Sequence, residues 1–322
     1  MQITKVVSLA ILLTSSGNIF ANLTSDQAAA KDKGIELYNQ YKVAEPELRI
    51  AATAGDSEAQ YYLANEIKNS KQYITPEAYE WYEKSANQGN FYAMFQLARG
   101  DNLCKAMTKC ESGSKTPRDW LNKLISTATP FALQGNGEAM EMLYYATGKL
   151  EWLEKAAAVN YAPAQRILAN YYEDGNGYFI IPGSRKKTIN ALLKSSAENG
   201  NPKAMMSYFA ELRAQNSLVE AGHWLEKAAE TGYEEAVFNY GYFLAVEPKT
   251  VGIDKDIVKG YALISLLKEL NGGGDVQTYV DRTLPEILSQ MTEDQIVKGD
   301  EMAKNWKSSH PPLSFFPEKL GY

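Results

Sequence analysis

The sequence predicts an all-α protein, a right-handed superhelical solenoid built from helix-turn-helix repeats. One pattern recurs along the chain, in which a large apolar residue stands 12 positions before an alanine. Strand signals are scarce, and Ala, Leu, Glu, Lys and Gln dominate the periodic segments. Self-similarity at a spacing of roughly 20–50 residues is typical of solenoids. The four copies are Trp81–Ala93 (WYEKSANQGNFYA), Trp152–Ala164 (WLEKAAAVNYAPA), Leu192–Ala204 (LLKSSAENGNPKA) and Trp224–Ala236 (WLEKAAETGYEEA).

Residues 1–21 have the features of a secretory signal peptide. Lys5 supplies the positive start, an apolar run follows from Val6 to Leu13, and Ala21 offers a small residue for cleavage. An uncleaved anchor is the alternative, but the run is far shorter than the ~20 apolar residues that span a bilayer. We therefore expect cleavage after Ala21, a periplasmic or secreted protein, and no integral membrane anchor.

Residues 22–55 are expected to form N-terminal cap helices. Asp26 can cap the first helix, and Gly55 stands where a helix C-terminus favours glycine. The match to the repeat pattern is weak here, as is usual for a capping repeat.

Residues 56–275 are expected to hold about six helix-pair repeats. An alanine marks the start of each first helix, and we call these six residues the keyed alanines: Ala59, Ala93, Ala139, Ala164, Ala204 and Ala236. Their spacing varies because loops and second helices differ in length. Pro130 is expected to break the long second helix that precedes Ala139.

Residues 276–310 are expected to form C-terminal capping helices, and residues 311–322 an extended tail. The tail contains four Pro or Gly positions together with Phe315, Phe316 and Tyr322. Two outcomes are open for the tail: docking on the last helices, or disorder.

The repeat layout resembles the Sel-one-like repeat family, a relative of the tetratricopeptide repeats. The resemblance covers about residues 45–275, and residues 291–306 resemble the terminal helix that often closes such arrays. One unit departs from the pattern, because an insertion with Cys104 and Cys110 replaces its Gly-x-Gly turn. The matching residues are Ala164, Gln165, Leu168, Ala169, Tyr172, Gly175 and Gly177 in one unit, and Trp81, Lys84, Ala86 and Gly89 in another.

Composition and motifs argue against catalysis, nucleic-acid binding and metal binding. The formal net charge is −6, without a strong Lys/Arg cluster. The histidines are His223 and His310, and no nucleophile motif, P-loop or metal-binding histidine pair accompanies them. We expect no enzyme activity, no cofactor and no metal. In an oxidising compartment Cys104 and Cys110 are expected to form a disulfide rather than a zinc site.

Partner-binding residues are expected on the helix face opposite the packed side. At about 100° per residue, positions three, six and seven after each keyed alanine face the groove of the solenoid. Tyr and Arg are favoured at interface hot spots. The alternative is that several of these tyrosines pack between repeats. The candidates are Tyr62, Arg99, Tyr145, Tyr171, Glu211, Asn239, Tyr242 and Phe243.

The resemblance implies a non-catalytic protein-binding scaffold, monomeric when unbound. Small signal-bearing members of the family are often periplasmic immunity proteins that bind and neutralise a type VI secretion toxin, such as a phospholipase effector. The alternative is an envelope or secreted adaptor that assembles proteins or binds a host glycoprotein. Penicillin-recognising members carry a Cys pair in nearly every repeat, whereas this chain has one pair.

Overall fold

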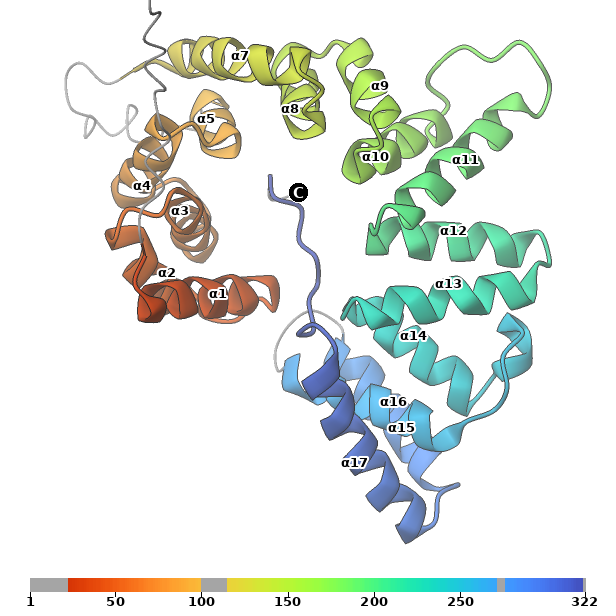
Figure 1. Ribbon diagram of the computed structural model, residues 1–322. Coiled ribbons are helices and arrows are strands. Elements are labelled where there is room, and N and C mark those ends of the chain that lie inside the picture. Colours follow the sequence, from red (N-terminus) through yellow and green to blue (C-terminus); the bar gives the residue numbers. More distant parts are fainter. Residues whose placement is uncertain (1–22, 100–114, 271–275, 321–322) are drawn as a thin grey trace, which may run out of the picture.

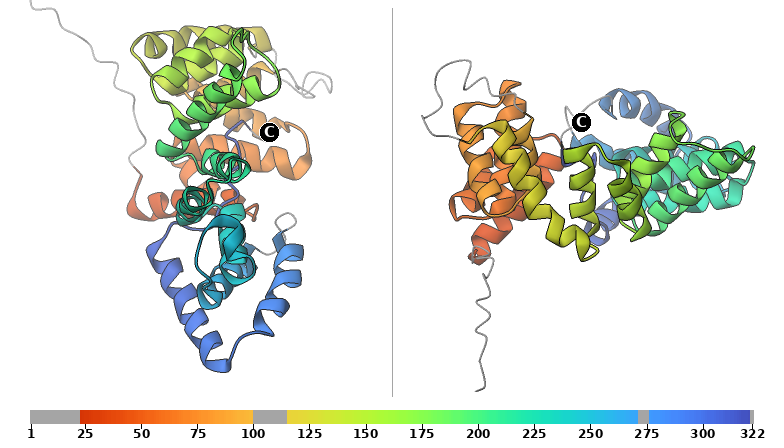
Figure 2. Two further views of the ribbon diagram at one scale, coloured as in Figure 1. Left: turned by 90° about the vertical axis from the view of Figure 1, so that its right-hand side faces the viewer. Right: turned by 90° about the horizontal axis from the view of Figure 1, so that it is seen from above.

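The computed structural model describes residues 23–99, 115–270 and 276–320. Within these ranges helices follow one another around a curve, and strand pairing is limited to one isolated bridge (Figure 1). The predicted right-handed, all-α superhelical solenoid is confirmed. Seen from above, the N-terminal helices and the later repeats form two sides of the curve (Figure 2).

Neighbouring helices pack in pairs along the chain. The cap pair is α1 (Ser25–Asn39) with α2 (Glu45–Thr53). In the described residues six pairs follow, each beginning with a helix that carries a keyed alanine: α3 (Ser57–Lys71) with α4 (Pro76–Asn87), α5 (Phe91–Ala98) with α7 (Pro117–Leu133), α8 (Gly137–Thr147) with α9 (Leu150–Ala158), α10 (Ala162–Glu173) with α11 (Ser184–Glu198), α12 (Pro202–Ala214) with α13 (Leu218–Glu230), and α14 (Glu234–Ala245) with α15 (Ile257–Leu266). The 3-10 helices η1 (Pro248–Val251) and η2 (Leu267–Leu270) flank α15, and α16 (Val276–Leu288) and α17 (Glu293–Ser309) come last.

The recurring pattern forms the junction between two helices. A single residue, two positions after the last residue of the second helix, adopts a left-handed conformation. Its φ is +97° at Gly89, +87° at Gly200 and +79° at Gly232. Glycine takes this conformation at little cost because it lacks a Cβ. Asn160 fills the same place at φ +62° in the copy that starts at Trp152. The chain therefore reverses at a fixed point of each repeat.

The next helix then begins with a side-chain cap. In four repeats an Asp or Asn side chain accepts a hydrogen bond from the amide of the keyed alanine three residues later, which satisfies one of the free amides of the first turn. All six keyed alanines are completely buried, so successive helices can approach closely. The capping residues are Asp56, Asn90, Asn136 and Asn201, at distances of 2.8, 3.0, 2.8 and 2.9 Å respectively.

The lysine three positions after each pattern tryptophan also has a physical role. The Nζ atom of Lys84 lies 4.0 Å from the ring centroid of Trp81, and that of Lys155 lies 4.5 Å from Trp152. Residues three apart share a helix face, and an ammonium group over an indole ring is attracted to it. The Trp-x-x-Lys spacing therefore places a lysine over one face of each ring.

Buried apolar side chains form two clusters that meet at α10. The first runs from Tyr38 to Leu168, and the second from Ala169 to Leu313. Leu320 belongs to the first cluster although it lies at the far end of the chain. The core is therefore continuous along the solenoid, as expected when each pair buries its apolar surface against the next.

The expectation that Pro130 breaks its helix is wrong. Helix α7 continues through Pro130 to Leu133. The proline stands in the last turn and is exposed, so the one hydrogen bond that it removes leaves a carbonyl group in contact with solvent. Its cost there is too small to end the helix.

Some expectations fall outside the described residues. These are the signal peptide at residues 1–21 and the disulfide between Cys104 and Cys110. In the ranges that are described, every helix is too short or too polar to cross a bilayer.

Candidate functional site

Residues 311–320, here called the crossing segment, leave the end of α17 and run along the inside of the curve (Figure 1). Two prolines follow His310 and cannot continue the helix. The segment is extended except at Phe316, where φ is +45°, and it ends in a turn at Lys319 and Leu320. The predicted tail therefore lies against the concave face, and its contacts reach far beyond the last helices.

Ser314 pairs with the junction before α14. Its amide donates to the carbonyl of Gly232 at 2.9 Å, and its own carbonyl accepts from the amide of Glu234 at 3.1 Å. These bonds form a parallel bridge between Ser314 and Tyr233. A Cβ atom at Gly232 would lie 2.5 Å from the carbonyl oxygen of Pro312. Glycine is therefore required here both for the turn and for the close approach of the segment.

The next residues bind the end of α1. The Phe315 amide donates to the carbonyl of Asn39 at 2.9 Å, and the Phe315 ring stacks on Tyr41 with 4.6 Å between centroids. The side-chain amide of Gln40 donates to the carbonyl of Leu313 at 3.0 Å. Adjacent residues of the segment thus connect α1 with the junction before α14, and this contact closes the curve.

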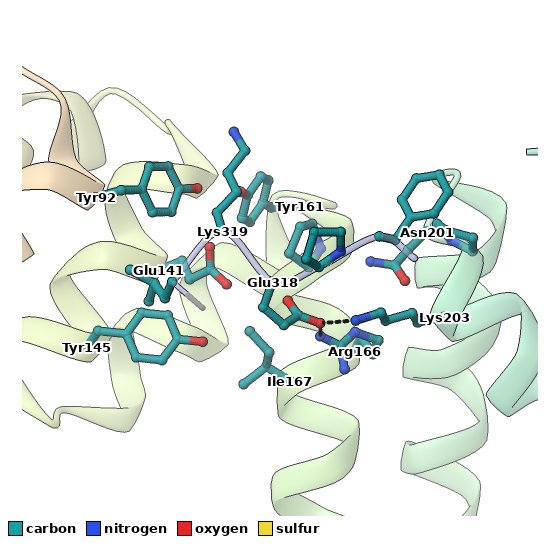
Figure 3. A pocket seen from close by; sticks show the side chains of 15 residues that line it. Tyr92, Glu141, Tyr145, Tyr161, Arg166, Ile167, Asn201, Lys203, Glu318 and Lys319 are labelled. Carbon is teal, nitrogen blue, oxygen red and sulfur yellow. Dashed lines mark hydrogen bonds and ion pairs between the residues drawn. The ribbon is translucent and has the colours of Figure 1, made fainter. Parts of the chain in front are cut away.

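Glu318 meets two cations from successive repeats. Its Oε1 atom lies 2.6 Å from Arg166 Nη2 on α10 and 2.9 Å from Lys203 Nζ on α12 (Figure 3). The Arg166 side chain is 14% exposed and the Glu318 side chain 35%. Partial burial strengthens such charge-assisted contacts relative to exposed ion pairs.

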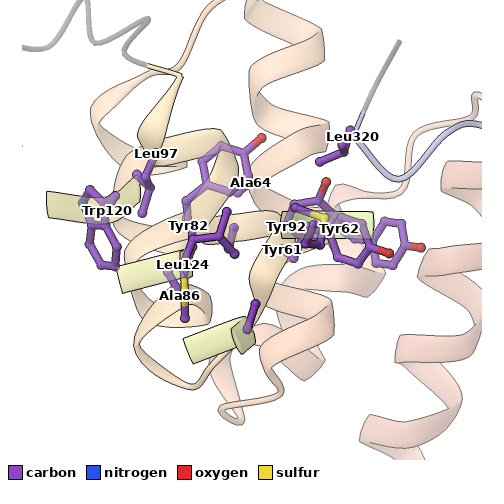
Figure 4. Packing of buried hydrophobic residues seen from close by; sticks show 14 of the residues in the cluster. Tyr61, Tyr62, Ala64, Tyr82, Ala86, Tyr92, Leu97, Trp120, Leu124 and Leu320 are labelled. Atoms are coloured by element: carbon purple, nitrogen blue, oxygen red, sulfur yellow. The ribbon is translucent and has the colours of Figure 1, made fainter. Parts of the chain in front are cut away.

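Leu320 ends the segment inside the N-terminal core. The hydroxyl of Tyr61 donates to the carbonyl of Lys319, and Gln96 Nε2 donates to the carbonyl of Leu320 at 2.9 Å. The Leu320 side chain is 4% exposed and lies beside the cluster that contains Tyr61 and Tyr92 (Figure 4). The concave face therefore holds an extended chain through its backbone, one carboxylate and one leucine.

Besides a small cavity of about 240 Å³ beside Lys319, two larger cavities border the crossing segment. One of about 480 Å³ lies beside Glu318 and is lined by Tyr145, Tyr161 and Arg166 among others. The other, about 830 Å³, lies between Phe315 and helices α14 and α16. Both are open to solvent, so the segment does not fill the concave face.

Glu141 is a buried carboxyl group at the first cavity. Burial, followed by the neighbouring carboxylates of Glu138 and Glu318, raises the pKa of Glu141 to about 7. Burial and the nearby Glu235 likewise raise the pKa of Glu234 to about 7. The protonation state of each of these two carboxyl groups therefore changes near neutral pH.

The predicted partner-binding residues are distributed over several places. Asn239, Tyr242 and Phe243 come together at the larger cavity, and Tyr145 lines the smaller one. Tyr62 is buried against Tyr38 and Tyr61. Separately from these, Tyr171 packs on Tyr172, Glu211 pairs with Lys186 at 3.5 Å, and Arg99 is exposed at the end of α5.

Sequence reasoning missed the two positions that hold the crossing segment. These lie one before and two after the keyed alanine, nearer the start of each first helix than the predicted stripe. Lys203 is the contact at the first position, and Tyr61 and Arg166 are contacts at the second. Large polar or aromatic residues at these places beside buried alanines were the available signal. Gln96 is a contact at the third position, which the stripe did include.

Replacing Gly232 tests the close approach of the crossing segment. Gly232→Ala adds left-handed strain and a clash with Pro312, whereas Gly200→Ala adds only the strain, since a Cβ at Gly200 meets no atom within 4 Å. We expect Gly200→Ala to lower the free energy of unfolding by about 1 kcal/mol, and Gly232→Ala by a further ~1–3 kcal/mol. Urea unfolding measures both. Equal losses would contradict the close contact.

The raised pKa of Glu141 predicts a pH dependence of stability. A carboxyl group with a raised pKa binds its proton more tightly in the folded chain, so stability falls as pH rises from about 4.5 to about 7 and stays low above that. Glu141→Gln should therefore raise the free energy of unfolding by about 1–3 kcal/mol at pH 8 and by little at pH 4. Denaturant unfolding across this range measures it, with Glu301→Gln at an exposed position of α17 as control. An identical pH slope in Glu141→Gln and the unchanged chain would rule out this origin.

Comparison with known proteins gives structural similarities only. No family model matches the sequence, and no curated protein matches it. One similar structure is a protective antigen of uropathogenic Escherichia coli with an SLR fold, 19% identical to this chain with a TM-score of 0.48. The match covers 89% of this chain but only 62% of the antigen's length. A Sel1 repeat protein of Oxalobacter formigenes is 20% identical (TM-score 0.40, covering 80% and 86% of the two chains). The immunity protein Pa5087 of Pseudomonas aeruginosa is 17% identical (TM-score 0.37, covering 72% and 81%). Sel1-repeat proteins, the group that the sequence motifs resemble, are thus among the solved structures similar to this chain.

Proposed function

We propose that this chain is a non-catalytic scaffold that binds a protein partner on its concave face. The observation that carries the proposal is the crossing segment itself. The face binds an extended polypeptide through backbone hydrogen bonds at Gly232 and Asn39, and through an ion-paired carboxylate at Arg166. Backbone hydrogen bonds with side-chain pockets between them are a general means of peptide recognition.

The chemistry of the face also favours a protein over a small substrate. Its cavities are open, and the described residues contain no cluster of His, Cys, Asp and Glu that could hold a metal ion. Aromatic side chains such as Tyr145 and Tyr242 line the cavities. Tyrosine provides a large contact area at low entropic cost, which is typical of protein-binding surfaces.

For the biological role we propose a periplasmic immunity protein that neutralises a type VI secretion toxin such as a phospholipase effector. The support is the secretory signal that the sequence predicts in residues 1–21, the lack of a recognised catalytic motif in the sequence and the aromatic concave face. The mechanism would be steric: the bound solenoid covers the active site of the toxin or the surface by which it docks on the membrane.

A challenge experiment tests this role. If a toxin gene lies beside this one, cells that lack this gene should be killed by that toxin, and periplasmic expression of this chain should restore survival. If the deletion strain resists the toxin as well as its parent does, the immunity role is wrong. A neighbouring gene of another kind, together with unchanged resistance, would favour the adaptor role.

A substitution at the smaller cavity tests the binding face directly. Tyr145→Ala should weaken the complex with the toxin at least tenfold, because truncating a hot-spot tyrosine costs about 2 kcal/mol or more and about 1.4 kcal/mol is already tenfold in affinity. Tyr178→Ala is the matched control, since Tyr178 is 90% exposed in the loop between α10 and α11. Isothermal titration with purified toxin measures both affinities. Equal affinities for the two variants would place the toxin elsewhere on the surface.

A further inference from the structure

The middle of the crossing segment is less buried than its two ends, where Leu313 and Leu320 belong to the two apolar clusters. Between these ends the segment lies beside a cavity of about 480 Å³ that is open to solvent, and its Lys319 is exposed. The segment therefore leaves part of the groove unoccupied.

The two cations that face Glu318 leave one buried nitrogen without a hydrogen bond in the described part of the chain. Arg166 and Lys203 both contact the same oxygen, Oε1 of Glu318. Arg166 Nε is buried and makes no hydrogen bond within the described residues. An arginine fork can bind both oxygens of a carboxylate through two of its nitrogens. A carboxylate that approaches from the cavity side could therefore bind more fully than Glu318 does.

The local charge at Arg166 and Lys203 favours an anion at the position of Glu318. The whole sequence has a formal net charge of −6, yet two cations from different repeats converge here on one anion. The Tyr61 hydroxyl and the Gln96 side chain then donate to the carbonyl groups of the next two residues, Lys319 and Leu320. The Leu320 side chain lies in the N-terminal apolar cluster. The contacts along the groove thus specify a carboxylate followed, two residues on, by an apolar side chain.

We propose that this groove is a recognition site for an extended segment of the protein partner that carries this same pattern, and that residues 313–320 occupy the site in the free protein. The inference rests on the proposed function, since it assigns the partner chemistry of the same face. The partner segment replaces Glu318 with its own carboxylate and Leu320 with its own apolar residue. Because the tethered segment competes at an effective concentration in the millimolar range, a free peptide of equal fit binds weakly until the tether is loosened.

Peptide binding to the full chain tests this assignment. The probe is a fluorescein-labelled synthetic peptide with the sequence of residues 313–320 (LSFFPEKL), measured by fluorescence polarisation. Glu318→Lys in the full chain places a third cation beside Arg166 and Lys203 and should release the segment. We expect the probe to bind this variant at least tenfold more tightly than the unchanged chain. Leu320→Lys offers a second route to release if the first variant folds poorly, as judged by circular dichroism.

Charge reversal supplies the controls. A peptide that carries Glu318→Lys should fail to bind the released chain, and should bind a full chain in which Arg166→Glu and Lys203→Glu together reverse the charge of the site. A full chain with Glu301→Lys, the same change at an exposed position of α17, should bind the original probe no better than the unchanged chain does. If neither released variant binds the probe above the unchanged chain, or if the charge of the peptide makes no difference, residues 313–320 are a permanent structural strap and the proposal is wrong.

This outcome is separate from that of the toxin challenge. Peptide binding with normal toxin sensitivity in the deletion strain would retain the recognition site and remove the immunity role. Toxin neutralisation without peptide binding would retain the role and place the partner on another surface.

Discussion

The architecture depends on one left-handed residue in each repeat. At Gly89, Gly200 and Gly232 the chain turns at positive φ between one helix and the next, and an Asp, Asn or Tyr then stands at the start of the following helix. Because the keyed alanine three residues later is completely buried, each new helix packs at nearly the same depth. Repeating the same junction gives the solenoid its curvature, and the curvature creates the concave face.

The curve is held closed by a segment that joins its two apolar clusters. Leu313 belongs to the cluster of the later repeats and Leu320 to that of the N-terminal repeats. Between them Ser314 and Phe315 bind the junction before α14 and the end of α1. The same contacts that stabilise the closed curve occupy the face on which a partner would bind. Stability and recognition therefore compete for one set of backbone groups.

Local features were predictable from the sequence, and long-range ones were not. The junction glycines and keyed alanines were found because their requirements, a positive φ and a small side chain, are met within a dozen residues. The path of the crossing segment depends on Asn39, Gln96 and Gly232, which are far from it in sequence. No periodic pattern marks such contacts. The predicted stripe leaves out two positions that contact the crossing segment for a related reason: a helical wheel gives the exposed side of one helix but not the direction in which the solenoid curves.

The electrostatics of the groove favour exchange over simple opening. If Glu318 left without a replacement, Arg166 and Lys203 would lose their shared carboxylate while Arg166 stayed largely buried, and a buried cation without a partner is costly. A partner carboxylate that enters as Glu318 leaves keeps the local charge constant. The charge term then nearly cancels between the free and bound states. In the proposed exchange, the affinity of a partner would therefore depend on what it adds beside the carboxylate, at Tyr145 and in the unfilled cavity.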